Sequence, residues 1–474
     1  MALVNNIISA IGNNSSIYPL IVRDCGIEVP TKVYKTYKQN KDDKEVAYLA
    51  TRERIIDEYA TSAVWLGGIP LIGNLCNRII SKIGYNPSVN VKLINAEDEI
   101  KKLEDKLLSE SEKSNILRIK EKISELKLQT IDSNIERFKD NDVAKRAVED
   151  LKKVKSNSAI YKKLQGNKFF LEMALPILFM GVIIPKAVYA LTAFTRRKNS
   201  KYRPKTVNYA LNNTQQISMM SFMTQNTDKP SFGANISSTM CNFTTVQKMA
   251  ITDGGYAVGR VATARKKRGA LDIAFKMTGM MYLNFVAPKQ IEKILSALTK
   301  TIFNLNVNLD PVILANRDFF EQVKKNSLNL PESDKLRDII SFIDNPKNAD
   351  SLYVRFASKL GKIKMLDSQT RDPRTFIDAK SLADLRNNMS NFQNEIQNLK
   401  IYFNKSSSGN DKRAVAKRLE LQVKNYFLKA RAAKTFNVLS NVALSSYLLA
   451  CVLPDVQYFL REKFLGTKLE PDLL

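Results

Sequence analysis

The chain has 474 residues, carries a net charge of +27 and contains no histidine. Without an imidazole, a Ser-His-Asp triad, a Cys-His nucleophile and a histidine-ligated zinc site are all excluded. The positive charge predicts an anionic partner, either nucleic acid or the anionic surface of a membrane. The 44% of hydrophobic and 26% of charged residues are ordinary values for a folded protein and argue against wholesale disorder.

The pattern of the whole chain predicts a mainly α protein. We expect a multi-helix assembly with a long helical hairpin or coiled coil and one or two membrane-embedded helical segments. Changes in composition divide the sequence into five regions, which are residues 1–91, 92–165, 166–268, 269–404 and 405–474.

Region 1–91 is predicted to be apolar and helical, and residues 2–12 fit a short amphipathic helix. The first basic residue is Arg23, so the charged start of a signal peptide is missing. Ala2 stands where N-myristoylation needs glycine. We therefore expect no lipid anchor and no cleaved leader at this end.

An uncharged stretch at 59–77 is the first candidate for membrane insertion. Its 19 residues are just long enough to span a bilayer as a straight helix. Gly67, Gly68 and Pro70 lie at its centre, however, and such residues usually interrupt a helix. The sequence therefore predicts a buried or re-entrant helix–turn–helix here.

Region 92–165 is predicted to form a charged helical hairpin or coiled coil. Apolar residues recur at three- and four-residue steps among dense lysine and glutamate. The polar run Ser109–Asn115 marks a plausible turn. Either the two helices pack on their own domain, or they bind a protein partner. The apolar positions are Ile100, Leu103, Leu107, Ile116, Ile119, Ile123 and Leu126.

Region 166–268 is predicted to be a basic, membrane-associated region. Phe169–Thr195 is mainly apolar and long enough to span a bilayer, but Pro176 and Pro185 should kink or split its helix. Because basic residues normally stay in the cytoplasm, lysines and arginines on both flanks favour a hairpin that dips in from the cytoplasmic side. A kinked spanning helix is the alternative.

Positive charge is concentrated around this segment. Residues 151–268 hold 20 lysines and arginines against three acidic residues, a net charge of +17. Each basic residue at an anionic membrane surface contributes about 1 kcal/mol. The residues expected to bind lipid phosphate are Arg196, Arg197, Lys198, Arg203, Arg260, Arg265, Lys266, Lys267 and Arg268.

The segment 253–260 has the glycine spacing of a phosphate-binding loop. Arg260 replaces the lysine of that motif and Val261 replaces its serine or threonine. The segment therefore departs from the nucleotide-binding motif at two positions. A glycine-rich turn that binds a lipid phosphate, or a plain turn, remains the expectation.

Region 269–404 is predicted to be a helical domain. We expect Asp310 and Asp378 to cap helices and Gly361 to end one. Three prolines are expected in the first turns of helices, where proline is best tolerated. They are Pro288, Pro311 and Pro331.

Region 405–474 is predicted to be a basic helix that leads into a C-terminal hydrophobic helix and tail. The uncharged run 435–454 has the length of one spanning helix. Asn437, Asn441 and Ser445 form a polar stripe at four-residue steps. Such a stripe should face protein, so the helix either spans while packed on another helix or is buried in a soluble core.

Six stretches are similar to a known group of proteins. They are NNSSIYPL at 13–20, WLGGIP at 65–70, AITDGGYAVGRVATAR at 250–265, YLNFVAP at 282–288, RDPR at 371–374 and NVLSNVALSS at 437–446. They resemble uncharacterised membrane-associated proteins of low-GC gut bacteria. The resemblance implies one family over most of the chain, but no known activity or functional residues.

The sequence shows no standard catalytic site, because it has no CxxC pair, and Asp372, Asp378 and Asp384 are six residues apart and do not share one helical face. The acidic pairs in 97–150 alternate with lysine and indicate surface ion pairs. We expect a non-enzymatic interaction or scaffold protein without a cofactor or metal, which binds an anionic membrane surface from the cytoplasmic face. A protein partner would bind through region 92–165. A nucleic-acid-binding protein and a lipid-modifying enzyme without histidine are the alternatives. The basic clusters flank apolar segments and not aromatics, which favours membrane over nucleic acid.

Overall fold

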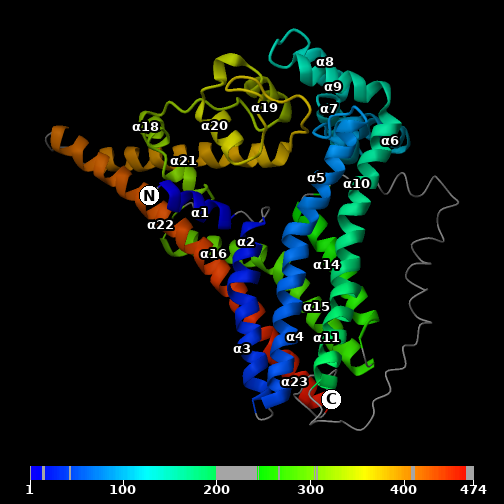
Figure 1. Ribbon diagram of the computed structural model, residues 1–474. Helices are drawn as coiled ribbons and strands as arrows, with labels where there is room; N and C mark the ends of the chain where they lie inside the picture. The colour runs from blue at the N-terminus through cyan, green and yellow to red at the C-terminus, as the bar shows by residue number, and fades with distance from the viewer. Residues whose placement is uncertain are drawn as a thin grey trace. The chain divides into compact units, whose positions relative to one another are not determined.

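The computed structural model describes residues 2–12, 17–41, 44–198, 243, 245–264, 267–303, 305, 308–406 and 412–465. Within these residues the chain is mainly helical, as predicted (Figure 1). The described part holds no strand, and one isolated antiparallel bridge joins Met365 to Arg371.

The chain divides into two compact units, each built from three separate stretches. Unit 1 contains residues 1–13, 80–161 and 289–442, and unit 2 contains residues 14–79, 162–288 and 443–474. Each unit therefore draws on several of the five sequence regions. The two units are described separately below.

Unit 1 contains the predicted helical hairpin, formed by α6 (Val91–Ser109) and α7 (Lys113–Lys127). The Asn90 side chain caps α6, and residues 110–112 form the turn inside the predicted polar run. Ile100 of α6 and Ile119 and Ile123 of α7 are buried in the seam between them. The hairpin is confirmed, whereas a coiled coil stays a prediction.

The other helices of unit 1 surround a large aromatic and aliphatic core. Phe319 and Phe392 are fully buried, and their ring centroids lie 6.0 Å apart. Phe427 contacts both rings, with centroid distances of 6.0 and 4.8 Å. The helices are α1 (Ala2–Gly12), α8 (Ile131–Phe138), α9 (Lys145–Ser156), α16 (Ala287–Phe303), α17 (Pro311–Leu314), α18 (Arg317–Lys325), α19 (Leu336–Ile343), α20 (Leu352–Lys359), α21 (Ala379–Ser406) and most of α22 (Lys412–Tyr447), which supplies Phe427.

Most of the residues predicted to cap or end helices in this unit lie at helix ends, as expected. The Asp310 carboxylate accepts a hydrogen bond from the Val312 amide at 2.8 Å, and Asp378 precedes α21. Gly361 follows α20 with a φ of +67°, the left-handed conformation that ends many helices.

The three proline predictions have different outcomes. Pro288 and Pro311 lie in the first turns of α16 and α17, as predicted. Pro331 lies in an irregular segment that ends before α19, so the prediction for it is wrong. Its fixed φ suits an extended connection as well as a first helical turn.

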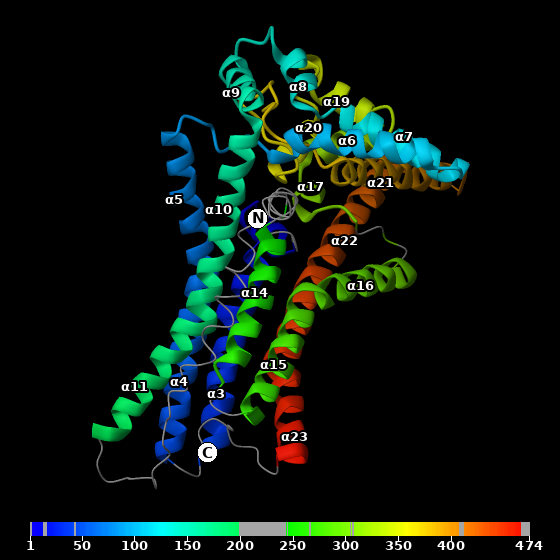
Figure 2. The same ribbon diagram turned by 90° about the vertical axis from the view of Figure 1, so that its right-hand side faces the viewer.

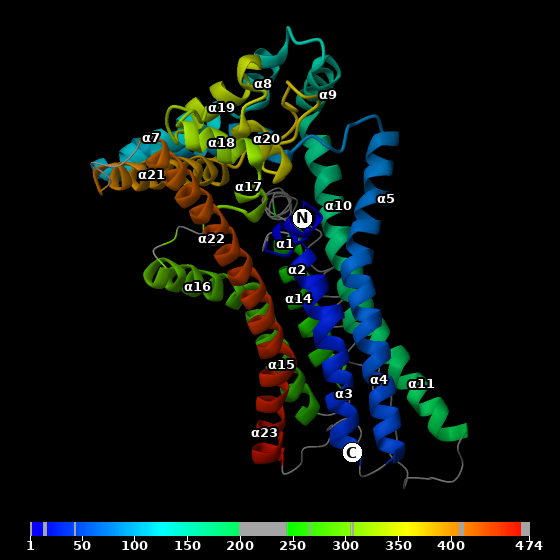
Figure 3. The same ribbon diagram turned by 90° about the vertical axis from the view of Figure 1, so that its left-hand side faces the viewer.

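Unit 2 is a bundle of helices that lie side by side (Figures 2 and 3). Their contacts form a closed ring. Helix α3 (Val29–Asn40) packs on α4 (Lys44–Ala63), and α4 packs on η3 (Phe179–Ile183) and α11 (Ile184–Lys198). Next, η3 contacts α14 (Thr245–Ala262), which contacts α15 (Lys267–Phe285). Helix α15 contacts η6 (Leu448–Val452) and α23 (Leu453–Leu465), and η6 returns to α3.

Four prolines are accommodated inside continuous helices of unit 2 by π-helical segments. Proline lacks the amide for an ordinary helical hydrogen bond and clashes with a carbonyl in the preceding turn, and the wider π turn gives it room. Each proline is the second residue after such a segment. The pairs are η1 (Val22–Glu28) with Pro30, η2 (Val64–Gly68) with Pro70, η3 with Pro185, and η6 with Pro454.

Two sequence predictions are therefore wrong. The helix through 59–77 contains no turn, because α4, η2 and α5 (Ile69–Lys82) follow one another without a break. The dipping hairpin at 169–195 is also absent, because α10 (Ser158–Leu178), η3 and α11 form one run of helix. Proline predicted a break at both places, but a π turn accommodates Pro70 and Pro185, and Pro176 lies inside α10.

Three helices of the described chain are long and apolar enough to cross a membrane. They are Ala47–Lys82, Ser158–Thr195 and Val415–Phe464, the last containing α22 (Lys412–Tyr447), η6 and α23. The sequence predicted one or two membrane-embedded segments, at 169–195 and 435–454. Ala47–Lys82 contains the stretch 59–77, for which a buried or re-entrant helix–turn–helix was predicted instead of one long helix. In each, less than half of the most apolar stretch is buried.

Two glycines bring η3 and α14 into backbone contact. A Cβ added to Gly259 would lie 3.0 Å from the Cα of Gly181, closer than most real Cβ atoms come to a neighbour. The Thr263 hydroxyl also donates to the Gly181 carbonyl at 3.2 Å. Small residues at this crossing let the helices pack closely, as they do in membrane bundles.

We expect Gly259→Leu to destabilise the bundle by about 1–3 kcal/mol, because the larger side chain forces the two backbones apart. Thermal unfolding of the full chain in detergent measures the effect. Gly67→Leu is the matched control, because an added Cβ there meets no atom within 4 Å. Equal stability of the two variants would contradict a close glycine contact.

Candidate functional site

The bundle of unit 2 has the polarity expected of a protein in lipid. Large apolar side chains cover its surface, and charged and polar side chains lie within it. Among the described residues, one cluster of buried apolar side chains in this unit is formed by Leu20, Trp65, Ile69, Met180 and Met249. The exposed side chains include Leu71, Leu75, Phe170, Phe194, Val258, Leu271, Tyr447 and Phe459.

One face of α3 carries a buried polar stripe at four-residue steps. Glu28, at the end of η1, begins it, and Lys32, Thr36 and Asn40 follow. All four residues are at most 5% exposed, whereas Tyr34 on another face is 63% exposed. A helix with polar residues inside and aromatic residues outside is inverted relative to a helix of a water-soluble bundle.

The Glu58 carboxylate lies at the centre of a group of largely buried cations in this interior, which form a basic layer. It pairs with Arg54 on its own helix at 3.1 Å, with Lys276 of α15 at 3.1 Å and with Lys32 of α3 at 3.8 Å. One carboxylate thus joins three helices through three cations. Burying so many charges is costly unless they are paired, which is the case here.

A second pair extends the basic layer toward α14. The Arg260 guanidinium forms an ion pair with Asp57 of α4, and both side chains are largely buried. The same guanidinium stacks over the Tyr256 ring, 5.2 Å from its centroid. The basic layer therefore holds four cations, Lys32, Arg54, Arg260 and Lys276, against the two carboxylates of Asp57 and Glu58.

An acidic layer lies beside the start of α3. Asp24, Glu28 and Asp253 of α14 lie within electrostatic range of one another, and Arg23 is the adjacent cation. The Arg23 Nε donates to the Pro19 carbonyl at 3.1 Å. This layer has three carboxylates for one arginine, so its charge is opposite to that of the basic layer.

Lys32 connects the two layers. It forms ion pairs with Glu28 and, at 3.8 Å, with Glu58. The separation of the layers can be estimated on α14, where Asp253 and Arg260 are seven residues apart, or about 10 Å at 1.5 Å per residue.

Further ion pairs join the helices of unit 2. Glu172 of α10 pairs with Lys248 of α14 at 2.6 Å. Asp272 of α15 accepts both hydrogen bonds of a bidentate pair with Arg461 of α23, at 2.7 and 2.5 Å. Lys35 of α3 reaches Asp455 of α23 at 2.6 Å.

No group of three histidine, cysteine, aspartate or glutamate side chains in the described residues is arranged to hold a metal ion. No known family model matches the chain, and searches of curated proteins and of solved structures find no similar protein. The chemistry of the site therefore has to be argued from its own residues.

The structure separates the residues that the sequence proposed for lipid phosphate. Arg260 is buried in its pair with Asp57, so it is not available to a lipid headgroup. The expected glycine-rich turn at 253–260 is wrong, because these residues lie inside α14 and their glycines pack against neighbouring helices. The backbones of Arg196, Arg197 and Lys198 belong to α11, and those of Lys267 and Arg268 to α15. Arg203, Arg265 and Lys266 lie outside the described residues.

The polar stripe at the end of α22 behaves as predicted. Asn437, Asn441 and Ser445 are all buried, while Phe436 and Leu439 beside them are more than half exposed. The Asn437 side-chain oxygen accepts a hydrogen bond from the Thr299 hydroxyl at 3.1 Å within unit 1.

Sequence reasoning missed the charged interior of unit 2. Its residues are spread over five helices, and each looks like an ordinary surface charge in isolation. A local signal does exist in the opposite charges four residues apart, at Glu28 with Lys32 and at Arg54 with Glu58. Such pairs also occur on solvated helices, so spacing alone does not reveal burial.

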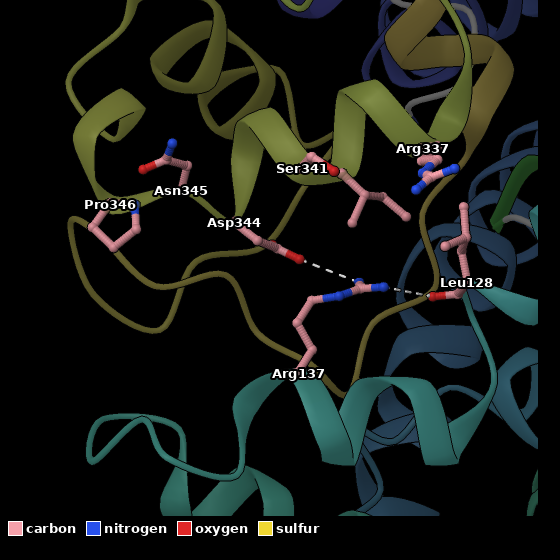
Figure 4. A pocket seen from close by; sticks show the side chains of 8 residues that line it. Leu128, Arg137, Arg337, Ser341, Asp344, Asn345 and Pro346 are labelled. Carbon is pink, nitrogen blue, oxygen red and sulfur yellow. Dashed lines mark hydrogen bonds and ion pairs between the residues drawn. The ribbon is translucent and has the colours of Figure 1, made fainter.

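A pocket of 420 Å³ in unit 1 is the second candidate (Figure 4). Arg137 of α8 points toward Asp344 at the end of α19 and pairs with it at 3.2 Å. Asp344 also accepts two hydrogen bonds from Arg371, at 2.8 and 3.0 Å. Burial lowers the pKa of the Arg137 guanidinium, and the Asp344 charge opposes that shift. The Asp344 carboxylate is thus paired with both Arg137 and Arg371. The residues at this pocket therefore have a structural role, because they join separate elements of unit 1.

Proposed function

We propose that the protein is an integral membrane protein in which unit 2 is embedded in the bilayer and unit 1 is a water-soluble helical domain. This proposal rests on the contrast between the interior of unit 1 and the interior of unit 2. Unit 1 encloses a large apolar core, whereas the interior of unit 2 holds many charged and polar side chains beside its apolar ones, and its surface exposes leucine, phenylalanine and tyrosine. A charged interior with an apolar exterior suits a lipid environment, where only the outer face meets hydrocarbon.

Unit 1 would act as the interaction module of a non-enzymatic scaffold. The α6–α7 hairpin supports this role, because Leu108 and Leu117 near its tip are 89% and 68% exposed. The basic clusters that flank the apolar helices would rest on anionic lipid on the cytoplasmic side, since lysine and arginine are retained there. Anionic headgroups would then meet the flanking clusters, and Arg260 would stay in the interior network.

Extraction of membranes tests the embedding of unit 2. We expect the full chain to stay in the membrane pellet after washes with high salt and with alkaline carbonate, because its apolar exterior is held by lipid and not by charge. Release by high salt alone would show that the protein is bound only at the surface. Recovery in the soluble fraction without any wash would overturn the proposal.

Labelling of the same membranes tests the orientation. A single cysteine introduced as Ser111→Cys, in a chain whose four cysteines are replaced by serine, lies in the exposed turn of the hairpin. A membrane-impermeant maleimide should label it only after the cells are broken. Labelling in intact cells would place unit 1 on the outer side.

A further inference from the structure

One face of α16 is apolar and exposed. Ile294, Leu298 and Ile302 recur on it at four-residue steps, and each of these side chains is at least 48% exposed. Three exposed lysines are spaced at four and seven residues, so the helical period places them together on the opposite side of the helix. The lysines are Lys289, Lys293 and Lys300. An apolar face opposite a basic face is typical of a helix that lies in the plane of a membrane interface.

The polar contacts that fix α16 to α22 lie on a third face. Glu292 pairs with Lys434 of α22 at 3.3 Å, and the Thr299 hydroxyl donates to the Asn437 side-chain oxygen at 3.1 Å. Figures 2 and 3 show that α16 runs outward from α22 and not alongside it. These contacts hold the helix in place and leave its apolar face exposed.

Helix α1 of the same unit resembles α16 in its exposed apolar side chains. It contains no charged residue, and three of its large apolar side chains are at least 48% exposed. They are Leu3, Val4 and Ile7. The Ser9 hydroxyl donates to the Asp310 carboxylate at 2.8 Å. Gly12 lies so close to α22 that a Cβ added to it would be 2.8 Å from the Val438 side chain.

Both helices meet α22 at the turn where its charges end. Their partners on α22 are Lys434, Asn437 and Val438. Lys434 is also the last charged residue before the uncharged run 435–454. In a spanning helix, such a change from basic to uncharged residues marks the boundary between the headgroups and the hydrocarbon. If α22 spans the bilayer, α1 and α16 therefore lie at the level of that boundary.

The path of the chain agrees with this level. Helix α1 ends at Gly12, and the first stretch of unit 2 begins at Asn14. The chain returns from unit 2 to unit 1 at Lys289, in the first turn of α16. Each of the two helices thus adjoins, along the chain, a stretch that belongs to the apolar-surfaced bundle.

We propose that α1 and α16 are interfacial helices that lie in the plane of an anionic bilayer, with their exposed apolar side chains among the acyl chains and the lysines of α16 at the headgroup phosphates. This inference rests on the proposed embedding of unit 2, and it adds a lipid-contacting edge to unit 1. A protein partner on the apolar face would leave the lysines unused. An anionic bilayer offers hydrocarbon to the apolar face and phosphate to the lysines.

Fluorescence quenching by brominated lipid tests the proposal. Trp65→Phe removes the single tryptophan of the chain, and Leu298→Trp adds one on the apolar face of α16. The full chain is reconstituted into vesicles of phosphatidylcholine and phosphatidylglycerol whose acyl chains carry bromine close to the headgroups. We expect at least about twofold lower fluorescence than in the same vesicles without bromine, because the indole would contact the acyl chains.

Leu117→Trp in the same background is the matched control, because Leu117 is an exposed leucine near the tip of the α6–α7 hairpin. We expect bromine to leave its fluorescence nearly unchanged and aqueous iodide to quench it. Equal fluorescence of Leu298→Trp with and without bromine would overturn the proposal. If the indole of that variant were also protected from iodide, a protein surface such as a second copy of the chain would cover the face instead.

The composition of the vesicles tests the role of charge. In phosphatidylcholine alone, the lysines of α16 meet no anionic headgroup, so we expect the quenching of Leu298→Trp to fall by about half. Equal quenching in both kinds of vesicle would overturn the preference for anionic lipid.

A nitroxide label covers the case in which the tryptophan variants do not fold. Ile294→Cys carries the label in a chain whose four cysteines are replaced by serine, and Ser111→Cys in the hairpin turn is the control. We expect the label of Ile294→Cys to collide more with oxygen, which is concentrated in lipid, than with a water-soluble nickel complex. The control should show the reverse order. The same order at both positions would contradict an interfacial α16.

Flotation of the vesicles after an alkaline carbonate wash separates the two proposals. A chain that floats but shows no lipid contact at Leu298 or Ile294 is embedded without interfacial helices, which overturns only this inference. A chain that does not float overturns the embedding of unit 2 as well.

Discussion

Replacing Glu58 by alanine is expected to destabilise the bundle of unit 2 by about 3–5 kcal/mol, the usual cost of breaking a buried ion pair by removing one partner. The carboxylate pairs with Arg54, Lys32 and Lys276, and Lys32 also pairs with Glu28. The variant therefore removes the carboxylate that these three largely buried cations share.

Unfolding of the full chain in detergent, followed by the loss of helical circular dichroism, measures this effect. Glu58→Gln separates charge from volume, since it keeps the size of the side chain and removes only the charge. We expect both variants to lose stability to a similar extent. Asp455→Asn, which removes a carboxylate from an exposed pair with Lys35, should stay close to wild type. A stable Glu58→Gln variant would show that packing, and not charge, holds this centre together.

Replacing Asp344 by alanine is expected to have an effect of similar size in unit 1. Asp344 is the carboxylate partner of Arg371, which is 1% exposed and stacks over the Phe138 ring at 5.1 Å. Without Asp344, the hydrogen bond of Arg371 to Asn134 at 3.3 Å remains, but the charge is unpaired. We expect a loss of about 3–5 kcal/mol, because an unpaired buried guanidinium costs far more than a missing surface contact.

Hydrogen exchange on the full chain can localise this loss. Peptides that cover α8 and α19 should exchange faster in Asp344→Ala, since both helices meet at the carboxylate. Arg355→Ala is the control, because Arg355 and Asp318 form a pair at 3.4 Å in which both side chains are more than half exposed. Its cost should stay below about 1 kcal/mol. Equal effects of the two variants would mean that the buried pair contributes no more than an exposed one.

Particular residues show where sequence reasoning succeeded. Asp310, Asp378 and Gly361 act at helix ends as predicted, because capping depends on a side chain and the few backbone atoms next to it. The hairpin of α6 and α7 was predicted for a related reason. Its apolar residues recur with the helical period, and its turn is polar.

The errors share one physical origin. Pro70 and Pro185 predicted breaks, yet the chain continues through both by widening into a π turn. Whether proline ends a helix or only distorts it depends on what the following residues can pack against, and that is decided by neighbouring helices. Arg260 was predicted to meet lipid phosphate because of the glycines before it, but those glycines serve helix contacts and the arginine meets Asp57.

The sequence by itself determined the helical class, the helix ends in unit 1 and the presence of segments apolar enough for a membrane, because each depends on local chemistry and on composition. Only the tertiary structure decided which charges are inside. Glu28, Lys32, Glu58, Asp253 and Lys276 come from parts of the chain up to 248 residues apart, and their pairing depends on how the helices of unit 2 pack. The positive charge that first suggested a membrane surface is thus partly used inside the bundle, where carboxylates balance it.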